Sequence, residues 1–182
     1  MIGQSLSPKQ LADEAQRAYT RGENMSAGRN YEAAAEGYQS LDDPITAAEM
    51  RNNSCVAYIQ SGDGDSALRV VEGTAEVFAN IGDIRRQGMA LGNLGSALEA
   101  VGRLNEAIDV YQQSASLLEQ AGETKLRANV MQSISALQLK TGHQLEALAT
   151  MQAGLESIEK PNPRQRMLKK LLQMPYKLLG GS

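Results

Sequence analysis

The residue types that most often carry catalysis or bind metals are scarce in this sequence. It has one cysteine, Cys55, and one histidine, His143. One thiol and one imidazole are too few for a disulfide framework, a zinc site of several cysteines or a centre with several histidines. No pair of acid–base groups with an orienting partner stands out. The sequence therefore predicts no catalytic, metal-binding or cofactor-binding residue, and it predicts that the protein is not an enzyme.

Two acidic runs look like structural turns. The run Gly62-Asp63-Gly64-Asp65-Ser66 has some features of a calcium loop. A complete loop needs about twelve residues and ends in a bidentate glutamate, which is absent here. We interpret Asp65 or Ser66 as the N-cap of a helix, and Asp42-Asp43-Pro44 as a turn that precedes another helix.

The charge is strongly polarised along the chain. The net charge of the 182 residues is −3. Residues 1–159 carry 12 basic and 21 acidic side chains, whereas residues 160–182 carry six basic side chains and no acidic one. There is no Trp and only one Phe. With so few aromatic rings and an acidic majority, nucleic acid is not an expected partner.

The sequence repeats itself with a period of 40 residues. Gly62, Gly102 and Gly142 share this spacing, and an alanine follows each of them five residues later (Ala67, Ala107, Ala147). Gly28 lies 34 residues before Gly62 in a similar local sequence, which indicates a first copy with a shorter spacing. The chain is therefore predicted to contain four copies of one structural unit.

Each copy is predicted to form two helices. Apolar residues recur every three or four positions over 84–101 and again over 104–121, and Gly102 and Gly122 follow these segments as helix terminators. No segment alternates with the period of two that a strand would show. Helices of this length joined by short turns pack as antiparallel neighbours, so the fold class is expected to be all-α.

The residues of the third copy resemble the tetratricopeptide repeat (TPR) family. The segment Asn93-Leu94-Gly95-x-x-Leu98-x-x-x-Gly102-x-x-x-Glu106-Ala107-Ile108-x-x-Tyr111 follows that family's core pattern. The resemblance implies a right-handed superhelical solenoid with small residues where helices cross, namely Cys55, Gly95 and Ser135. In the first copy the matching position is Arg21. The 40-residue spacing is similar to the long-repeat subgroup of kinesin light chains and Leu-Gly-Asn adaptors.

The predicted domain organisation has two parts. A repeat domain spans 8–160, with hairpins at 8–41, 44–82, 84–122 and 124–160. A basic segment spans 161–182, in which a helix begins after Pro161 and Pro163 and ends at Pro175. This helix is expected to cap the solenoid. Two alternatives for it stay open: it docks on an anionic membrane surface or an acidic partner, or it folds into a groove of the same or another copy.

The resemblance implies that the first helices of the hairpins line a concave face that binds protein. The candidate peptide-binding residues on this face combine amides, which both donate and accept hydrogen bonds, with cations that attract acidic side chains. They are Asn52, Asn53, Arg85, Met89, Asn93, Ser96, Lys125, Asn129 and Gln132. The alternative is that Asn53 and Asn93 only tie neighbouring helices together.

The predicted function is that of a non-enzymatic interaction scaffold that binds a peptide or protein segment in the concave groove. One alternative is a peripheral membrane adaptor that docks through Lys169, Lys170 and Lys177, and another is a self-associating TPR protein. No apolar segment is long enough for a membrane span or a secretory leader, so a cytoplasmic location is expected.

Overall fold

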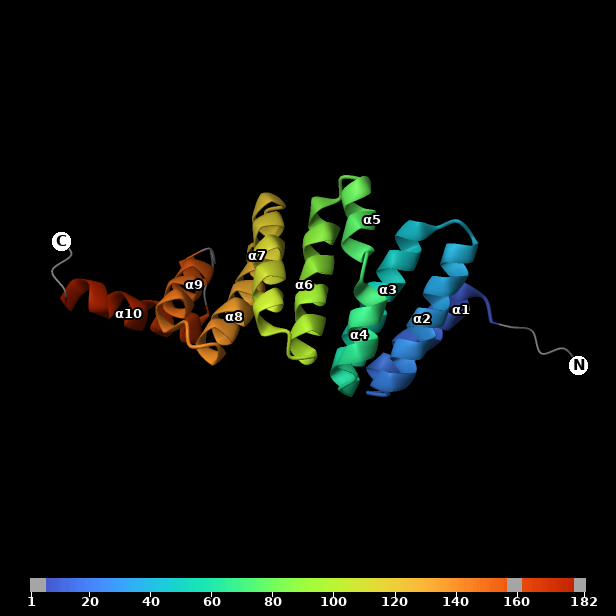
Figure 1. Cartoon of the computed structure of the whole chain (residues 1–182), viewed down its shortest axis with the longest axis horizontal. Coiled ribbons are helices and arrows are strands. Elements are labelled where there is room, and N and C mark those ends of the chain that lie inside the picture. Colours follow the sequence, from blue (N-terminus) through green and yellow to red (C-terminus); the bar gives the residue numbers. More distant parts are fainter. Residues whose placement is uncertain (1–5, 157–161, 179–182) are drawn as a thin grey trace, which may run out of the picture.

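The computed structural model describes residues 6–156 and 162–178, with side chains described up to residue 170. Within these residues the chain is helical and has no strand, which confirms the all-α prediction (Figure 1). The helices are α1 Pro8–Thr20, α2 Asn24–Ser40, α3 Pro44–Ser61, α4 Gly64–Val71, α5 Thr74–Asn80, α6 Ile84–Ala100, α7 Leu104–Gln120, α8 Thr124–Lys140, α9 Gln144–Glu156 and α10 Pro163–Leu178.

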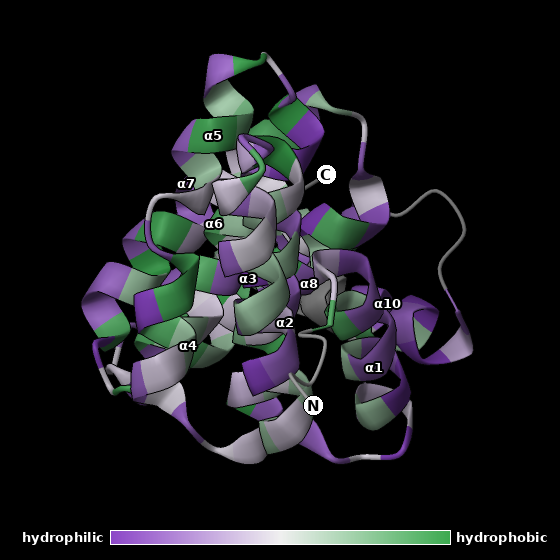
Figure 2. Cartoon of the chain, turned by 90° about the vertical axis from the view of Figure 1, so that its right-hand side faces the viewer, coloured by the Kyte–Doolittle hydropathy of each residue, from purple (hydrophilic) through white to green (hydrophobic). Residues whose placement is uncertain are grey.

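The helices pack as a row of antiparallel hairpins. The pairs α1–α2, α6–α7 and α8–α9 each pack together, and α3 packs with both α4 and α5. Successive hairpins meet mainly through α2–α3, α4–α6, α5–α6 and α7–α8, so in the described part of the chain the main contacts of each hairpin are with its neighbours along the row (Figure 1). Viewed along the row, each helix carries both hydrophobic and hydrophilic stretches (Figure 2). The apolar sides meet between helices and form the core.

Turns recur every 20 residues and correct the predicted spacing of the first copy. Residues 22, 42, 62, 82, 102, 122 and 142 all have φ between 59° and 86°, and all are glycines except Asp42. The first copy is therefore aligned by Gly22, 40 residues before Gly62, and the predicted spacing of 34 is wrong. Gly28 lies instead inside α2, where an added Cβ would come within 2.9 Å of the Tyr58 ring.

The corrected alignment removes the irregularity that the first copy seemed to have. Ala15, not Arg21, occupies the position of Gly95. The residues at this position of the four copies are all buried: Ala15, Cys55, Gly95 and Ser135. The second small position is a buried alanine in every copy: Ala27, Ala67, Ala107 and Ala147. Small side chains at these crossings let neighbouring helices approach closely.

The second hairpin departs from the predicted pair of helices. Its second segment breaks between α4 and α5 at Glu72 and Gly73, where Gly73 has φ 77°. The buried Thr74 donates its hydroxyl hydrogen to the Val71 carbonyl at 2.8 Å, which satisfies one of the acceptors that the break leaves free. The helical periodicity of the sequence continues across this break and gave no sign of it.

The acidic turns act as helix caps. The carboxylates of Asp43, Asp63 and Asp83 accept a hydrogen bond from the backbone N–H three residues later, at 2.8–3.0 Å. These bonds lower the pKa of each carboxyl, because the backbone donors favour the charged form. Asp63 is therefore the N-cap that was predicted at Asp65 or Ser66.

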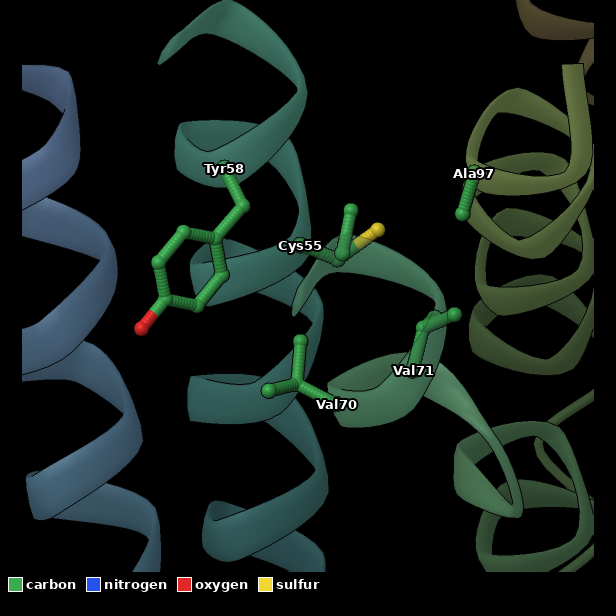
Figure 3. Close-up of a cluster of buried hydrophobic side chains, with 6 residues drawn as sticks. Cys55, Tyr58, Val70, Val71 and Ala97 are labelled. Carbon is green, nitrogen blue, oxygen red and sulfur yellow. The ribbon is translucent and has the colours of Figure 1, made fainter. Parts of the chain in front are cut away.

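The buried side chains gather where three helices meet. One cluster joins Cys55 and Tyr58 of α3, Val70 and Val71 of α4, and Ala97 of α6 (Figure 3). A second cluster joins α6, α7 and α8 around Tyr111. Because each cluster spans two successive hairpins, the hairpins stabilise one another.

The last helix begins as predicted but extends further. Asn162 accepts a hydrogen bond from the Gln165 backbone N–H at 2.9 Å, and Pro163 starts α10. The predicted end at Pro175 is wrong, because α10 continues to Leu178. Pro161 lies outside the described residues, and the proposed division at 160/161 stays a prediction.

Candidate functional site

A hollow of about 230 Å³ lies between α6, α7 and α8. Its two walls come from the first helices of the third and fourth hairpins, and its floor comes from α7. Four of the predicted peptide-binding residues meet here: Met89, Asn93, Ser96 and Asn129. The other lining residues are Gly92 on α6, Leu126, Val130 and Ser133 on α8, and Tyr111, Ser114 and Leu118 on α7. We call this hollow the α6–α8 groove.

The α6–α8 groove has apolar walls with polar groups along its floor and rim. The Tyr111 hydroxyl lies 2.8 Å from the Ser96 hydroxyl and donates to the Glu99 carboxylate at 3.4 Å. Ser114 donates to the Gly88 carbonyl at 2.7 Å. Burial raises the pKa of Tyr111, so its hydroxyl stays protonated as a donor. Such a mixed surface suits the backbone and one apolar side chain of a bound segment.

A second hollow of about 230 Å³ lies on the other side of α8, between α8, α9 and α10. Asn129 lines both hollows, and Gln132 lines the second. Met131, Met151, Leu155 and Leu168 give this hollow an apolar lining. The two hollows therefore form adjacent sites on either side of α8.

Two of the predicted amides are joined by one hydrogen bond between hairpins. Asn93 donates to the Asn52 side-chain oxygen at 2.9 Å, and Asn52 donates to the Ala48 carbonyl at 2.9 Å. This contact ties α6 to α3, as the alternative for Asn93 described. Asn53, in contrast, is exposed and lines neither hollow.

The predicted cations fall into two groups. Arg85 forms an ion pair with Glu123, at the turn before α8, so this guanidinium is already occupied by the next hairpin. Its neighbour Arg86 bridges Asp83 and Glu49 and stacks over the Phe78 ring at 5.1 Å. Lys125 is exposed, with no ion-pair partner among the described residues.

The basic C-terminal residues are only partly described. Lys170 is exposed and Lys169 is half-buried on α10. The Lys177 side chain lies outside the described residues.

Cys55 lies in the core, and His143 lies on the surface. Cys55 is fully buried, and its burial raises the thiol pKa to about 12, so it is not a reactive thiolate near neutral pH. His143 is exposed, with Nδ1 3.0 Å from the Thr141 hydroxyl. Over 6–156 and 162–170 no three His, Cys, Asp or Glu side chains come together as a metal site.

The sequence did not reveal the floor of the α6–α8 groove. Tyr111, Ser114 and Leu118 lie on the second helix of the hairpin, where the repeat pattern predicts packing residues. Ser114 is the one residue of this floor that the sequence could have pointed to, because the helical period places its hydroxyl on the buried face of α7. Leu126 and Val130, also unpredicted, come from the first helix of the next hairpin.

Comparison with known proteins places this solenoid in a family. The sequence model of the soluble NSF attachment protein (SNAP) family matches residues 9–162. The chain belongs to the SNAP family. The sequence had indicated the TPR-like helical repeat, which this match supports, but not the SNAP family itself.

The solved structures show the same fold for this SNAP-family chain. Two crystal structures hold nearly identical TPR-like repeats of a protein described as a kinesin light chain from Podosopora anserina. Both match with a TM-score of 0.74 and 15% identity, covering 94% and 97% of this chain and 86% and 90% of theirs. No curated protein matches. In the described part of the chain, no helix is both long and apolar enough to cross a membrane.

Proposed function

We propose that this SNAP-family chain is a non-enzymatic, cytoplasmic scaffold that binds a peptide or protein segment along the α6–α8 groove and the adjoining hollow. The observation that carries the proposal is the α6–α8 groove itself, where Met89, Asn93, Ser96 and Asn129 converge from two hairpins. The family assignment supports an adaptor role.

The groove suits a segment that presents an apolar side chain between hydrogen-bonding groups. Leu126 and Val130 line it together with Met89, while Asn129 supplies an exposed amide that forms no hydrogen bond with another described residue. Gly92 has no side chain to fill the space beside Ser114 and Val130. We infer that an apolar anchor enters at Gly92 and that Asn129 and Gln132 bond the backbone beside it.

NSF, after which the family is named, is the first partner to test. The proposal does not depend on that partner, because the groove is defined by its own residues. Membership of the long-repeat subgroup of kinesin light chains also stays a proposal. The solved structures match at 15% identity, which shows the fold alone.

The membrane-adaptor alternative has less support. Leu168 of α10 lines the hollow against α8 and α9, and is therefore turned largely toward the protein. Among the apolar residues of α10 with described side chains, this leaves Met167 as the one that is mainly exposed. Within residues 163–170, this part of α10 therefore offers little apolar area to an anionic surface.

The test uses selection of binding peptides from a random library on the full chain, with NSF measured in parallel. Lys125→Ala, Asn129→Ala and Gln132→Ala are combined, because these side chains are groove-facing or exposed and do not bond another hairpin. Loss of several hydrogen bonds of about 1 kcal/mol each weakens affinity by roughly tenfold or more. Asn93 and Arg85 are left intact, since both hold hairpins together.

The matched control removes exposed amides elsewhere, with Gln113→Ala and Gln120→Ala on α7. We expect the control to bind the selected peptides as the unaltered chain does. Peptides or NSF that bind the α8 variant with full affinity would contradict the proposed role of α8 and place the binding surface elsewhere.

A further inference from the structure

The α8–α9 hairpin forms the C-terminal edge of the solenoid. The half of this edge near the turn between α8 and α9 is apolar and exposed. Leu139 at the end of α8, and Leu145 and Leu148 at the start of α9, are exposed, with 82% of Leu145 accessible. We call these three residues the edge patch. The residues 80 and 40 positions before Leu148, Leu68 and Ile108, pack into clusters between successive hairpins. Leu148 therefore occupies a position that is used for hairpin contact elsewhere in the chain.

The other half of the same edge is covered by α10. Leu168 lines the hollow with Met131 of the first half of α8 and Leu155 of the second half of α9. Because α8 and α9 are antiparallel, this half lies at the opposite end of the hairpin from the edge patch. Beyond this contact α10 extends away from the row of hairpins (Figure 1).

The two halves of the edge differ in charge. Residues 160–182 contain no acidic side chain, and Lys170 is exposed beside Met167, which is 63% accessible. Near the edge patch, Asp109 and Glu146 line a shallow hollow between α7 and α9. Both are exposed and without an ion-pair partner in the described ranges. One half is thus projecting and basic. The other is apolar, with Asp109 and Glu146 beside Leu145 and Leu148 and the exposed Lys140 next to Leu139.

We propose that two copies of this chain pack C-terminal edge to C-terminal edge about a twofold axis, with α10 of each copy on the edge patch of the other. A twofold contact pairs the unlike halves, so that Met167 meets Leu145 and Leu148 while Lys170 approaches Glu146. The reverse pairing would place α10 against α10 and bring like charges together. This interface is closed, and it is independent of the α6–α8 groove.

The oligomeric state of the full chain tests the proposal. Sedimentation velocity and light scattering at concentrations of up to about 100 μM are expected to show a species of twice the 19.6 kDa chain mass. Leu145→Glu with Leu148→Glu should yield a monomer with an unchanged circular dichroism spectrum, because both side chains are exposed in one copy. Leu41→Glu is the matched control, since Leu41 is 67% accessible in the turn between α2 and α3.

A charge exchange tests the register of the interface. Lys170→Glu and Glu146→Lys should each weaken the dimer by roughly fivefold, and the two together should restore it, because each reversal alone places like charges side by side. A chain that stays monomeric throughout this concentration range overturns the proposal. Assembly that Leu41→Glu abolishes overturns it as well, since that result would place the interface at the turn between α2 and α3 instead of at the C-terminal edge.

Discussion

At the scale of single residues, small side chains decide how closely the helices cross. Gly95 of α6 faces the Tyr111 ring of α7, and a Cβ on Gly95 would come within 2.6 Å of a ring carbon. Tyr111 is buried and held by hydrogen bonds to Ser96 and Glu99, so its ring has little room to move. Gly92, one turn earlier, meets only the Ser114 hydroxyl within 3.3 Å and the Val130 methyl group at 3.8 Å.

Gly95→Ala is therefore expected to destabilise the fold by roughly 1–3 kcal/mol, because overpacking forces the two helices apart. Gly92→Ala on the same helix is expected to leave stability unchanged or to raise it by up to about 1 kcal/mol, through its higher helix propensity. Urea unfolding followed by circular dichroism measures both. Equal effects of the two substitutions would show that the Tyr111 contact does not limit the crossing.

At the scale of helices and turns, each turn described above contains one residue with a left-handed backbone conformation. Asp42 is the only residue other than glycine with positive φ in the described chain, at 59°. It stands where Gly22 and Gly62 stand in the flanking turns. An L side chain in this conformation costs about 1–2 kcal/mol, and aspartate is among the residues that tolerate it best.

Asp42→Gly is expected to raise the melting temperature by roughly 2 °C, because relief of backbone strain slightly exceeds the added freedom of the unfolded chain. The companion variant is Gly122→Ala, at φ 72° with no atom within 4 Å of the added Cβ. It should lower stability by about 1 kcal/mol through backbone strain alone. Thermal unfolding in which Asp42→Gly lowers the melting temperature would mean that the aspartate side chain stabilises this turn.

At the scale of the whole molecule, stability is shared between neighbours along the row. The central hairpin, α6–α7, has a hairpin on each side, and two buried clusters join it to them. The last helix, α10, has its main contact with α9. In a solenoid of this kind local opening starts at the ends, where one set of neighbours is missing.

Native-state hydrogen exchange at low protein concentration should therefore be slowest in the centres of α6 and α7 and fastest in α10. Exchange in α1 serves as the internal comparison, because α1 is the other terminal helix and packs along α2. Uniform protection from α1 to α10 would contradict this expectation and indicate that the chain opens only as one cooperative unit.

Much of the fold followed from the sequence alone, because its evidence is local. The period of 40 residues, the apolar spacing of three and four, and the glycine after each helix depend on residues close together in the chain. These features determined the all-α repeat and the small residues at Gly95 and Ala107. The spacing of the first copy was misjudged, because Gly28 resembles a turn glycine locally but is required by its distant contact with Tyr58.

Tertiary structure decided which predicted residues are available to a partner. Asn93 and Asn129 are both amides on the first helices of their hairpins, and both line the groove, yet Asn93 already bonds Asn52 across 41 residues, whereas Asn129 bonds no other described residue. The position of α10 and the exposed edge patch likewise depend on which hairpin faces are covered. Periodicity identifies the face of a helix that is buried, but it does not identify the distant residue that covers that face.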